Sequence, residues 1–276
     1  GLTWFLNAQK VNNKIKEIHK RNPINVVETA ELALAFLHKL KGIKYITRLH
    51  GGHHFFAEAE NRGIDKWKGF QEKRSFSKAD AFVAVSNYVK THTEKYLSYN
   101  NKPIEIINYP ISFSKFYISD KSKVVPSSIV FAGTVCEKKG IRQLVQALPV
   151  ILEKFPETKL EVYGRDWLFP NQSSYIEFLK KQTPKSILDK ITFHGAISHD
   201  VLPEVYEQAN VCVFPSHMET QGLVAPEAMA MEKVVVFTEL GPGPETIEHL
   251  KTGLLCNPLE PVDIAAKIMW VFEQNQ

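Results

Sequence analysis

Two glutamates eight residues apart have the spacing in this chain that best suits a chemical role. Glu219 follows an apolar run that ends at Pro215, and Glu227 stands near the start of a helical pattern. Backbone N–H groups at residues 222–224 are unpaired at such a helix start and attract anions, including a diphosphate. Glu219 could then contact a sugar, and Glu227 could accept hydrogen bonds from a ribose diol. Taken alone, the pair also fits a solvated loop residue and an ordinary helix start.

The segment around the two glutamates closely resembles glycosyltransferase family 4, whose members share the GT-B fold. ETQGLVAPEAMA at 219–230 matches the family's Glu-x7-Glu segment with its trailing Glu-Ala-Met-Ala. FAGTVCEKKGIRQLVQAL at 131–148 is similar to the family's first strand, phosphate loop and helix. The similarity covers residues 124–272 and, more weakly, 24–116. The resemblance therefore implies a retaining, nucleotide-sugar-dependent glycosyltransferase.

The resemblance implies separate roles for the residues of a donor site. Glu219 would lie beside the transferred sugar, Glu227 would hold the nucleotide ribose, and Lys139 would stabilise charge on the departing diphosphate. Gly164 and the turn at 193–195 would frame the base through backbone contacts. The donor-binding residues that the resemblance implies are Gly133, Thr134, Lys139, Gly164, Arg165, His194, Gly195, Gln221, Gly222, Leu223, Val224 and Glu227.

Two positions depart from the family pattern. Where relatives carry a Gly-Arg pair whose arginine binds phosphate, Gly133 is followed here by Thr134. A neutral hydroxyl cannot supply that charge, so either Arg165 or Arg142 compensates, or the leaving group is activated less. Gln221 stands where phenylalanine is common, which leaves the glutamate pair intact but could alter the selection of the donor sugar.

A cluster of histidines and glycines, RLHGGHHFF, occupies residues 48–56. Relatives often carry a His-Gly pair here that reaches toward the donor sugar and the acceptor, so the resemblance implies a catalytic role for His50. A metal site is the alternative, but no carboxylate follows at ligand spacing and the family's chemistry requires no metal. We therefore expect neither a metal nor a cofactor, because the nucleotide-sugar is a substrate. The acceptor-side candidates are His50, Gly51, Gly52 and His53, with His54 a further candidate.

The elements that position these residues follow from the hydrophobic pattern. Short apolar runs rich in β-branched residues, typical of buried parallel strands, alternate with helical patterns in both halves. This alternation predicts doubly wound α/β domains. Together with the resemblance, it predicts a GT-B type fold of two Rossmann-like domains facing a cleft, the N-terminal one incomplete. The expected strands are 24–29, 45–50, 81–86 and 104–110, then 129–133, 160–164, 191–195, 211–216, 234–239 and 253–256.

The charge balance reverses near a polar, proline-containing segment at 117–128. Residues 1–123 carry 21 Lys and Arg against 11 Asp and Glu, whereas residues 124–276 carry 13 against 19. Such a change in composition is typical of a domain boundary. We therefore predict an acceptor-side domain at 1–118, a linker at 119–128 and a donor-binding domain at 129–276.

The predicted reaction transfers a hexose-type sugar, with retention, from a UDP- or GDP-type donor to a hydroxyl of a glycan or lipid-linked acceptor. The departing phosphate oxygen would take the acceptor's proton, so no separate base is required. The basic first half favours an anionic acceptor or membrane, as in bacterial surface polysaccharide synthesis, and we do not expect a nucleic-acid partner. A solvated surface in a Lys-rich proteome explains the same charge equally well.

No apolar stretch is long enough to span a bilayer, and the first residues do not resemble a signal peptide. We therefore predict a cytoplasmic location, with association at the inner face of the membrane. Relatives open with a strand and a Gly-rich loop that residues 1–22 lack, and they continue past this C-terminus, so we expect a chain clipped at both ends. Two alternatives stay open: a non-catalytic nucleotide-sugar-binding fragment, favoured by Thr134, and a GT-B nucleotide-sugar epimerase.

Overall fold

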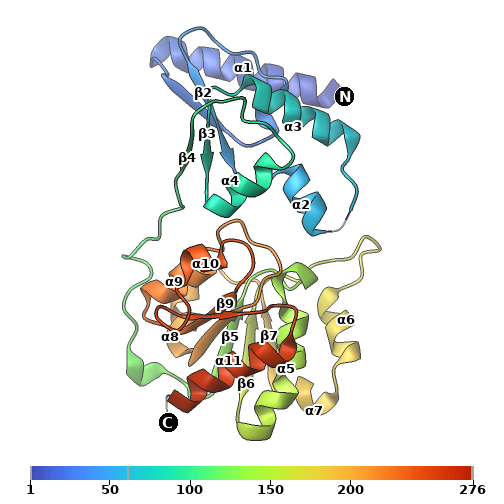
Figure 1. The fold of residues 1–276 in the computed structure, drawn as a ribbon, viewed down its shortest axis with the longest axis vertical. Helices are drawn as coiled ribbons and strands as arrows, with labels where there is room; N and C mark the ends of the chain where they lie inside the picture. Colours follow the sequence, from blue (N-terminus) through green and yellow to red (C-terminus); the bar gives the residue numbers. More distant parts are fainter. Residues whose placement is uncertain (1, 61, 275–276) are drawn as a thin grey trace. The chain divides into compact units, whose positions relative to one another are not determined.

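The chain forms two compact α/β units, residues 1–108 and 109–276. A computed structural model describes residues 2–60 and 62–274. The strands of both units pair in parallel (Figure 1), which confirms the predicted fold class. Every predicted strand is present, with most ends shifted by one or two residues, but the strand predicted at 104–110 already ends at Ile106.

The boundary between the units differs from the predicted one. It falls between Asn108 and Tyr109, whereas the sequence placed a linker at 119–128 and domain limits at 118 and 129. Phe116 is 2% exposed within a core of the second unit, and Ser119 Oγ donates a 2.7 Å hydrogen bond to the carbonyl of Met231. The polar composition was misleading because Phe116 packs in the core of the second unit and Ser119 bonds to it, although most of the residues that follow are exposed.

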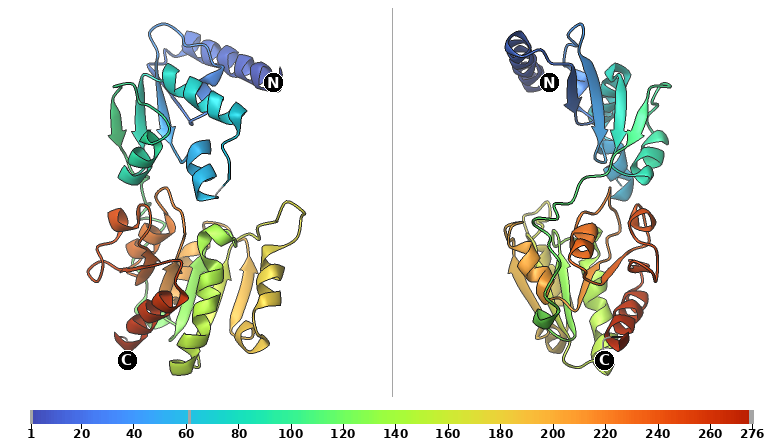
Figure 2. Two further views of the ribbon diagram at one scale, coloured as in Figure 1. Left: turned by 45° about the vertical axis from the view of Figure 1, so that its right-hand side comes forward. Right: turned by 90° about the vertical axis from the view of Figure 1, so that its left-hand side faces the viewer.

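The first unit is a four-stranded sheet with helices on both of its sides (Figure 2). Its strands, in sheet order, are β1 (Val26–Thr29), β2 (Lys44–Leu49), β3 (Ala81–Ala84) and β4 (Ile104–Ile106). Its helices are α1 (Leu2–Arg21), the 3-10 turn η1 (Ala33–Ala35), α2 (His53–Ala59), α3 (Lys66–Lys78) and α4 (Asn87–Glu94). Side-chain caps begin two helices: Asp65 accepts from the N–H of Lys68, and Ser86 accepts from the N–H of Val89.

The second unit is a six-stranded sheet that winds outward in both directions from its centre. Its strands are β5 (Ser128–Ala132), β6 (Lys159–Tyr163), β7 (Ile191–Gly195), β8 (Val211–Phe214), β9 (Val235–Thr238) and β10 (Leu254–Cys256). Their order is β10-β9-β8-β5-β6-β7, so the winding direction reverses between β5 and β8. Ligands of such sheets bind beyond the carboxyl ends of the strands at this reversal.

Helices cover both faces of the second sheet because neighbouring strand residues point to opposite sides. Ile129 and Phe131 share one core with α5 (Ile141–Lys154) and α11 (Pro261–Gln274), which lie side by side (Figure 2). Val130 and Ala132 share the other core with α8 (Leu202–Gln208) and α9 (Val224–Ala230). The remaining elements are η2 (Lys121–Lys123), η3 (Glu137–Lys139), α6 (Tyr175–Gln182), α7 (Lys185–Leu188) and α10 (Gly243–Thr246).

Candidate functional site

The loops that follow β5 and β8 interlock where the winding direction reverses. A Cβ atom on Gly140 would lie 1.8 Å from the carbonyl oxygen of Pro215, and Gly140 has a left-handed φ of +70°. The N–H of His217 donates a 2.9 Å hydrogen bond to the carbonyl of Lys138. Glycine alone suits both this φ angle and this close approach, so Gly140 determines how the two loops meet.

The interlock brings together two of the predicted catalytic residues. Lys139 Nζ lies 2.5 Å from Glu219 Oε1, and Ser216 Oγ donates to the same oxygen at 2.8 Å. Glu219 is 8% exposed, whereas the Lys139 side chain is 26% exposed. The carboxylate is therefore oriented and charge-paired, while the ammonium group is open to an incoming anion.

A pocket of about 360 Å³ lies in the second unit, at the carboxyl ends of β5, β6 and β7. It adjoins the charged pair, because a Cβ on Gly222 would lie 3.3 Å from Glu219 Cγ and the next residue, Leu223, lines the pocket. This volume is within the range of small-molecule sites. The predicted donor residues that line it are Gly133, Gly164, Arg165, Leu223, Val224 and Glu227.

Other predicted donor residues lie outside the lining of this pocket: Thr134, Lys139, His194, Gly195, Gln221 and Gly222. His194 faces its neighbours on the sheet, where its ring stacks 4.2 Å from that of Tyr163 and Nε2 lies 2.6 Å from Glu161 Oε2. Gln221 is buried, and its side-chain amide exchanges two hydrogen bonds with the backbone of Tyr109. Its side chain is thus used to hold the start of the second unit, so any effect on the donor sugar would be indirect.

Glu227 lies at the inner wall of the pocket and is 5% exposed. Its Oε1 accepts a 2.8 Å hydrogen bond from His199 Nε2. Burial raises the pKa of the Glu227 carboxyl, and the contact with His199 opposes that rise. His199 was missed in the sequence, as were the other lining residues Ala132, Tyr163, Ala196, Ile197, Ser198 and Leu202. For residues 196–199 the available signal was their place directly after the predicted strand 191–195, at the end where a parallel sheet binds ligands.

The two arginines that could supply the positive charge missing at Thr134 have different surroundings. Arg142 forms two hydrogen bonds with Glu137, of 2.8 and 2.5 Å, and lowers the pKa of that carboxyl to about 2. Tyr175 donates a further 2.5 Å hydrogen bond to Glu137, so Arg142 helps to hold the loop in place. Arg165 lines the pocket, and its side chain makes no hydrogen bond or ion pair with any described residue. Arg165 is therefore the available cation.

In the first unit, two buried carboxylates accept hydrogen bonds from the backbone of the predicted acceptor-side loop. Glu31 accepts a hydrogen bond from the N–H of His50, and Glu72 accepts one from the N–H of His53. A Cβ on Gly52 would lie 2.0 Å from Glu72 Oε1, so the backbone passes close over this carboxylate. Both Glu31 and Glu72 are buried, whereas His50 is exposed.

The prediction that His53 faces an acceptor requires a correction. Its side chain is 7% exposed, and Nε2 accepts a 2.8 Å hydrogen bond from the N–H of Asp65. His54 is 5% exposed and is bonded through Nδ1 to Glu72. Both rings are therefore used in the packing of α2 against α3, which leaves His50 as the accessible histidine of this cluster.

Replacing Glu31 with glutamine should change how stability depends on pH. Burial raises the pKa of Glu31 to about 7, above its usual value of 4.5. The folded state therefore binds the proton more tightly, and the stabilisation is complete below pH 4.5 and lost as pH rises through 7. Glutamine does not titrate, so from pH 5 to pH 8 the free energy of unfolding of Glu31→Gln should gain about 2–3 kcal/mol relative to the wild type.

Urea unfolding at several pH values would measure this difference. Glu28→Gln is the control, because Glu28 is exposed and its hydrogen bond with Arg48 lowers its pKa. The stabilisation by Glu28 is present above its usual pKa and is lost as pH falls. Its contribution to the pH dependence of stability is therefore opposite in sign to that of Glu31. Parallel stability curves for Glu31→Gln and the wild type would contradict the assignment of a raised pKa to Glu31.

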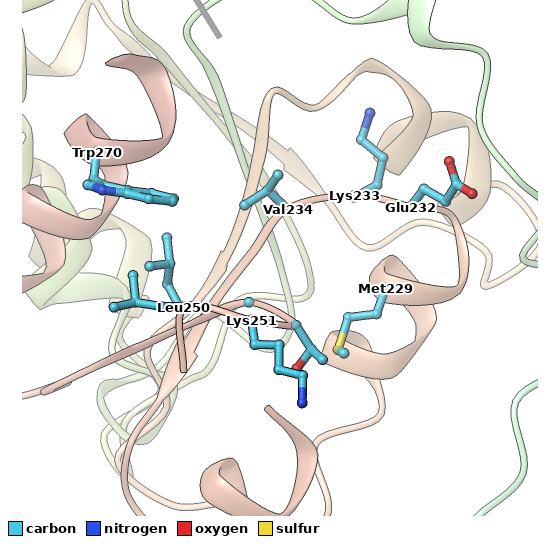
Figure 3. A pocket seen from close by; sticks show the side chains of 10 residues that line it. Met229, Glu232, Lys233, Val234, Leu250, Lys251 and Trp270 are labelled. Carbon is cyan, nitrogen blue, oxygen red and sulfur yellow. The ribbon is translucent and has the colours of Figure 1, made fainter. Parts of the chain in front are cut away.

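A second pocket, drawn in Figure 3, lies at the opposite end of the second sheet. Val234 and Gly253, which line it, precede β9 and β10, so it opens at the amino ends of these strands. Its wall includes Met229, Leu250 and Trp270. This position is away from the ends where parallel sheets bind their ligands, and we do not assign it to the donor.

Residues 2–60 and 62–274 contain neither a cluster of metal-ligating side chains nor a helix that could span a membrane. No three or more His, Cys, Asp or Glu side chains there are grouped as metal ligands. None of the helices in these ranges combines the length and the apolar character needed to cross a bilayer.

Two curated relatives match about half of the chain. An uncharacterized glycosyltransferase of Methanocaldococcus jannaschii is 36% identical over 137 residues, which cover 50% of this chain and 33% of that protein. The capsular polysaccharide biosynthesis glycosyltransferase CapM of Staphylococcus aureus is 28% identical over 176 residues, 57% of this chain and 42% of that protein. The chain thus spans less than half the length of these two relatives.

Solved structures resemble the fold across both units. Sucrose-phosphate synthase from Thermosynechococcus elongatus has a TM-score of 0.81 at 23% identity, covering 98% of this chain and 69% of its own. HepE from Anabaena, solved in complex with UDP and glucose, has a TM-score of 0.75 at 19% identity, covering 95% and 72%. At these identities the likeness shows the fold alone, which is that of GT-B proteins with two Rossmann-like halves.

Family comparison covers nearly the whole chain. Residues 5–115 match glycosyltransferase family 4. Residues 126–274, more than half of the chain, match glycosyl transferases group 1. The chain belongs to the group 1 family of glycosyl transferases.

Proposed function

We propose that the protein is a retaining glycosyltransferase that moves a hexose-type sugar from a nucleoside diphosphate-sugar to a hydroxyl group. The observation that carries the proposal is the Lys139–Glu219 pair beside a pocket that contains Glu227. These groups match the polar parts of such a donor. Lys139 is a cation for the diphosphate, Glu219 is a carboxylate for the sugar, and Glu227 is a carboxylate for the ribose.

Each side chain has a role that follows from its surroundings. Lys139 neutralises charge on the departing diphosphate, and the exposed Arg165 supplies the second cation that Thr134 cannot. Glu219, oriented by Lys139 and Ser216, accepts hydrogen bonds from sugar hydroxyls. The acceptor hydroxyl attacks from the face that the diphosphate leaves, and a phosphate oxygen takes its proton. This route requires neither a protein base nor a metal ion.

The donor and acceptor classes are supported more indirectly. HepE, whose fold this chain shares, was solved with UDP and glucose, and this supports a UDP- or GDP-type donor. CapM is named for capsular polysaccharide biosynthesis, which supports a glycan or lipid-linked acceptor. The excess of Lys and Arg in residues 1–123 suits an anionic acceptor at the cytoplasmic face of a membrane. We propose His50 as the catalytic histidine on the acceptor side, with Gly51 and Gly52 forming its loop.

Nucleotide binding and turnover together test this proposal. We expect UDP or GDP at a hundredfold excess over its dissociation constant to stabilise the protein by about 2.7 kcal/mol, seen as a rise in Tm. The same protein should release sugar from the matching radiolabelled donor, and an excess of EDTA should leave that rate unchanged. Loss of activity on chelation would contradict the metal-free route.

Binding without turnover would favour the alternative of a non-catalytic nucleotide-sugar-binding protein. Thr134 is the observation behind that alternative, because it leaves the phosphate site without the family's arginine. Conversion of the bound sugar to an epimer, without release or transfer, would favour an epimerase. A failure to bind any nucleoside diphosphate would refute the donor site itself.

A further inference from the structure

Three side chains of the second unit form a chain of hydrogen bonds that ends at Glu227. Lys115 Nζ lies 2.8 Å from His199 Nδ1, and His199 Nε2 lies 2.8 Å from Glu227 Oε1. Lys115 Nζ also donates a 2.6 Å hydrogen bond to Asp200 Oδ1, which holds the ammonium group in place. The ring of Phe116 meets that of His199 edge to face at 5.4 Å. The imidazole is therefore fixed by contacts on several sides.

The chemistry of the ammonium group determines the form of the imidazole. A lysine ammonium group can only donate hydrogen bonds, so His199 Nδ1 must accept with its lone pair. The ring is then neutral and carries its proton on Nε2. That N–H group points at Glu227 Oε1 and donates to it. Lys115 thus selects the tautomer that presents a donor to the carboxylate.

Glu227 keeps one oxygen available for a ligand. Among the described residues, Oε1 is bonded to His199, and Oε2 has no hydrogen-bond partner. Glu227 is 5% exposed and lines the pocket together with His199. Oε2 therefore belongs to a largely buried side chain and can accept a hydrogen bond from a donor in the ligand. A hydroxyl group in the pocket would supply that donor.

We propose that His199, held in one tautomer by Lys115, is a positioning residue that orients Glu227 for the ribose hydroxyls of the donor nucleotide. The inference rests on the proposed function, because it requires the pocket to bind a nucleoside diphosphate. It adds a determinant that the Glu-x7-Glu segment does not contain, from the loop between β7 and α8. The contact selects ribose over deoxyribose, since only ribose offers the 2′-hydroxyl to the oriented carboxylate.

The ratio of dissociation constants for 2′-deoxy and ribo forms of UDP and GDP measures this selection. For the wild-type chain we expect a ratio of roughly ten or more for the nucleotide that binds, the worth of one hydrogen bond to a charged group. His199→Ala should reduce the ratio to about two, and His199→Gln, whose amide can still donate, should retain most of it. Lys115→Met should reduce the ratio partly, because the ring can then turn.

The variants distinguish a loss of Glu227 orientation from a general loss of protein stability. The His199 side chain is 59% exposed, so its truncation removes little from the core, and an unchanged Tm would show that the fold is intact. Lys251→Met is the matched control for Lys115→Met, because Lys251 pairs with Glu248 outside this pocket and should leave the ratio unchanged. If His199→Ala binds nucleotide with the wild-type ratio, the inference is overturned while the proposed function stands. If the wild type binds neither UDP nor GDP, the proposed function falls and the inference with it.

Discussion

Replacing Lys139 with methionine should lower the rate of sugar transfer by a factor of roughly 10²–10³, the usual effect of removing one group that stabilises charge in a transition state. Methionine keeps much of the length of the side chain but loses the cation. Glu219 then loses its 2.5 Å partner while it stays largely buried, so the orientation of the carboxylate should also suffer. Initial rates with a radiolabelled donor would measure the loss.

Lys138→Met is the matched control, since it removes the same charge from the adjacent position of η3. It should lower the rate by much less, because the hydrogen bond from His217 is accepted by the backbone carbonyl of Lys138, which the substitution keeps. A double-mutant cycle with Glu219→Gln would test the pairing, since groups that act together give non-additive effects. Equal losses in Lys138→Met and Lys139→Met would remove Lys139 from the proposed site.

A methyl group on Gly140 should destabilise the second unit by about 3 kcal/mol and remove most of the activity. The added Cβ would lie 1.8 Å from the Pro215 carbonyl oxygen, so the two loops must move apart. The φ of +70° adds a separate penalty for any residue with a Cβ. Because the shift falls between Lys139 and Glu219, transfer should be lost even in molecules that remain folded.

Gly195→Ala separates the two causes of this loss. Gly195 has a similar φ of +76°, but a Cβ there would meet no atom within 4 Å. Its destabilisation should therefore report the φ penalty alone, about 1 kcal/mol. Urea unfolding of both variants, followed by circular dichroism, would give the two values. A Gly140→Ala variant no less stable than Gly195→Ala would show that the loops do not interlock tightly.

The architecture could be predicted because it depends on local patterns. Runs such as 129–133 and 211–216 are apolar on both faces, and this identifies buried parallel strands whatever lies around them. The boundary of the units could not be predicted in the same way. Phe116 belongs to the second unit through its contact with Tyr206 of α8, and Ser119 through its bond to Met231, directly after α9; nothing in the residues beside them shows this.

The candidate site was predictable where a residue's neighbours in sequence are also its neighbours in space. Leu223, Val224 and Glu227 share one loop and helix, and all three line the pocket. His199 escaped notice because its importance comes from a contact with Glu227, 28 residues further along the chain. His53 was misread because its burial depends on packing between α2 and α3, which a motif of histidines and glycines does not show.

The interlocked loops also constrain the order in which the protein can become functional. Lys139 and Glu219 are 80 residues apart, and they meet only after β8 has paired with β5. Pairing over such a distance is slow in folding because a long loop must close first. An emerging chain that has completed β5, β6 and β7 therefore already holds Lys139 without its carboxylate partner. The proposed donor site can therefore form only after β8 has joined the sheet, although β9, β10 and α11 still follow it in the chain.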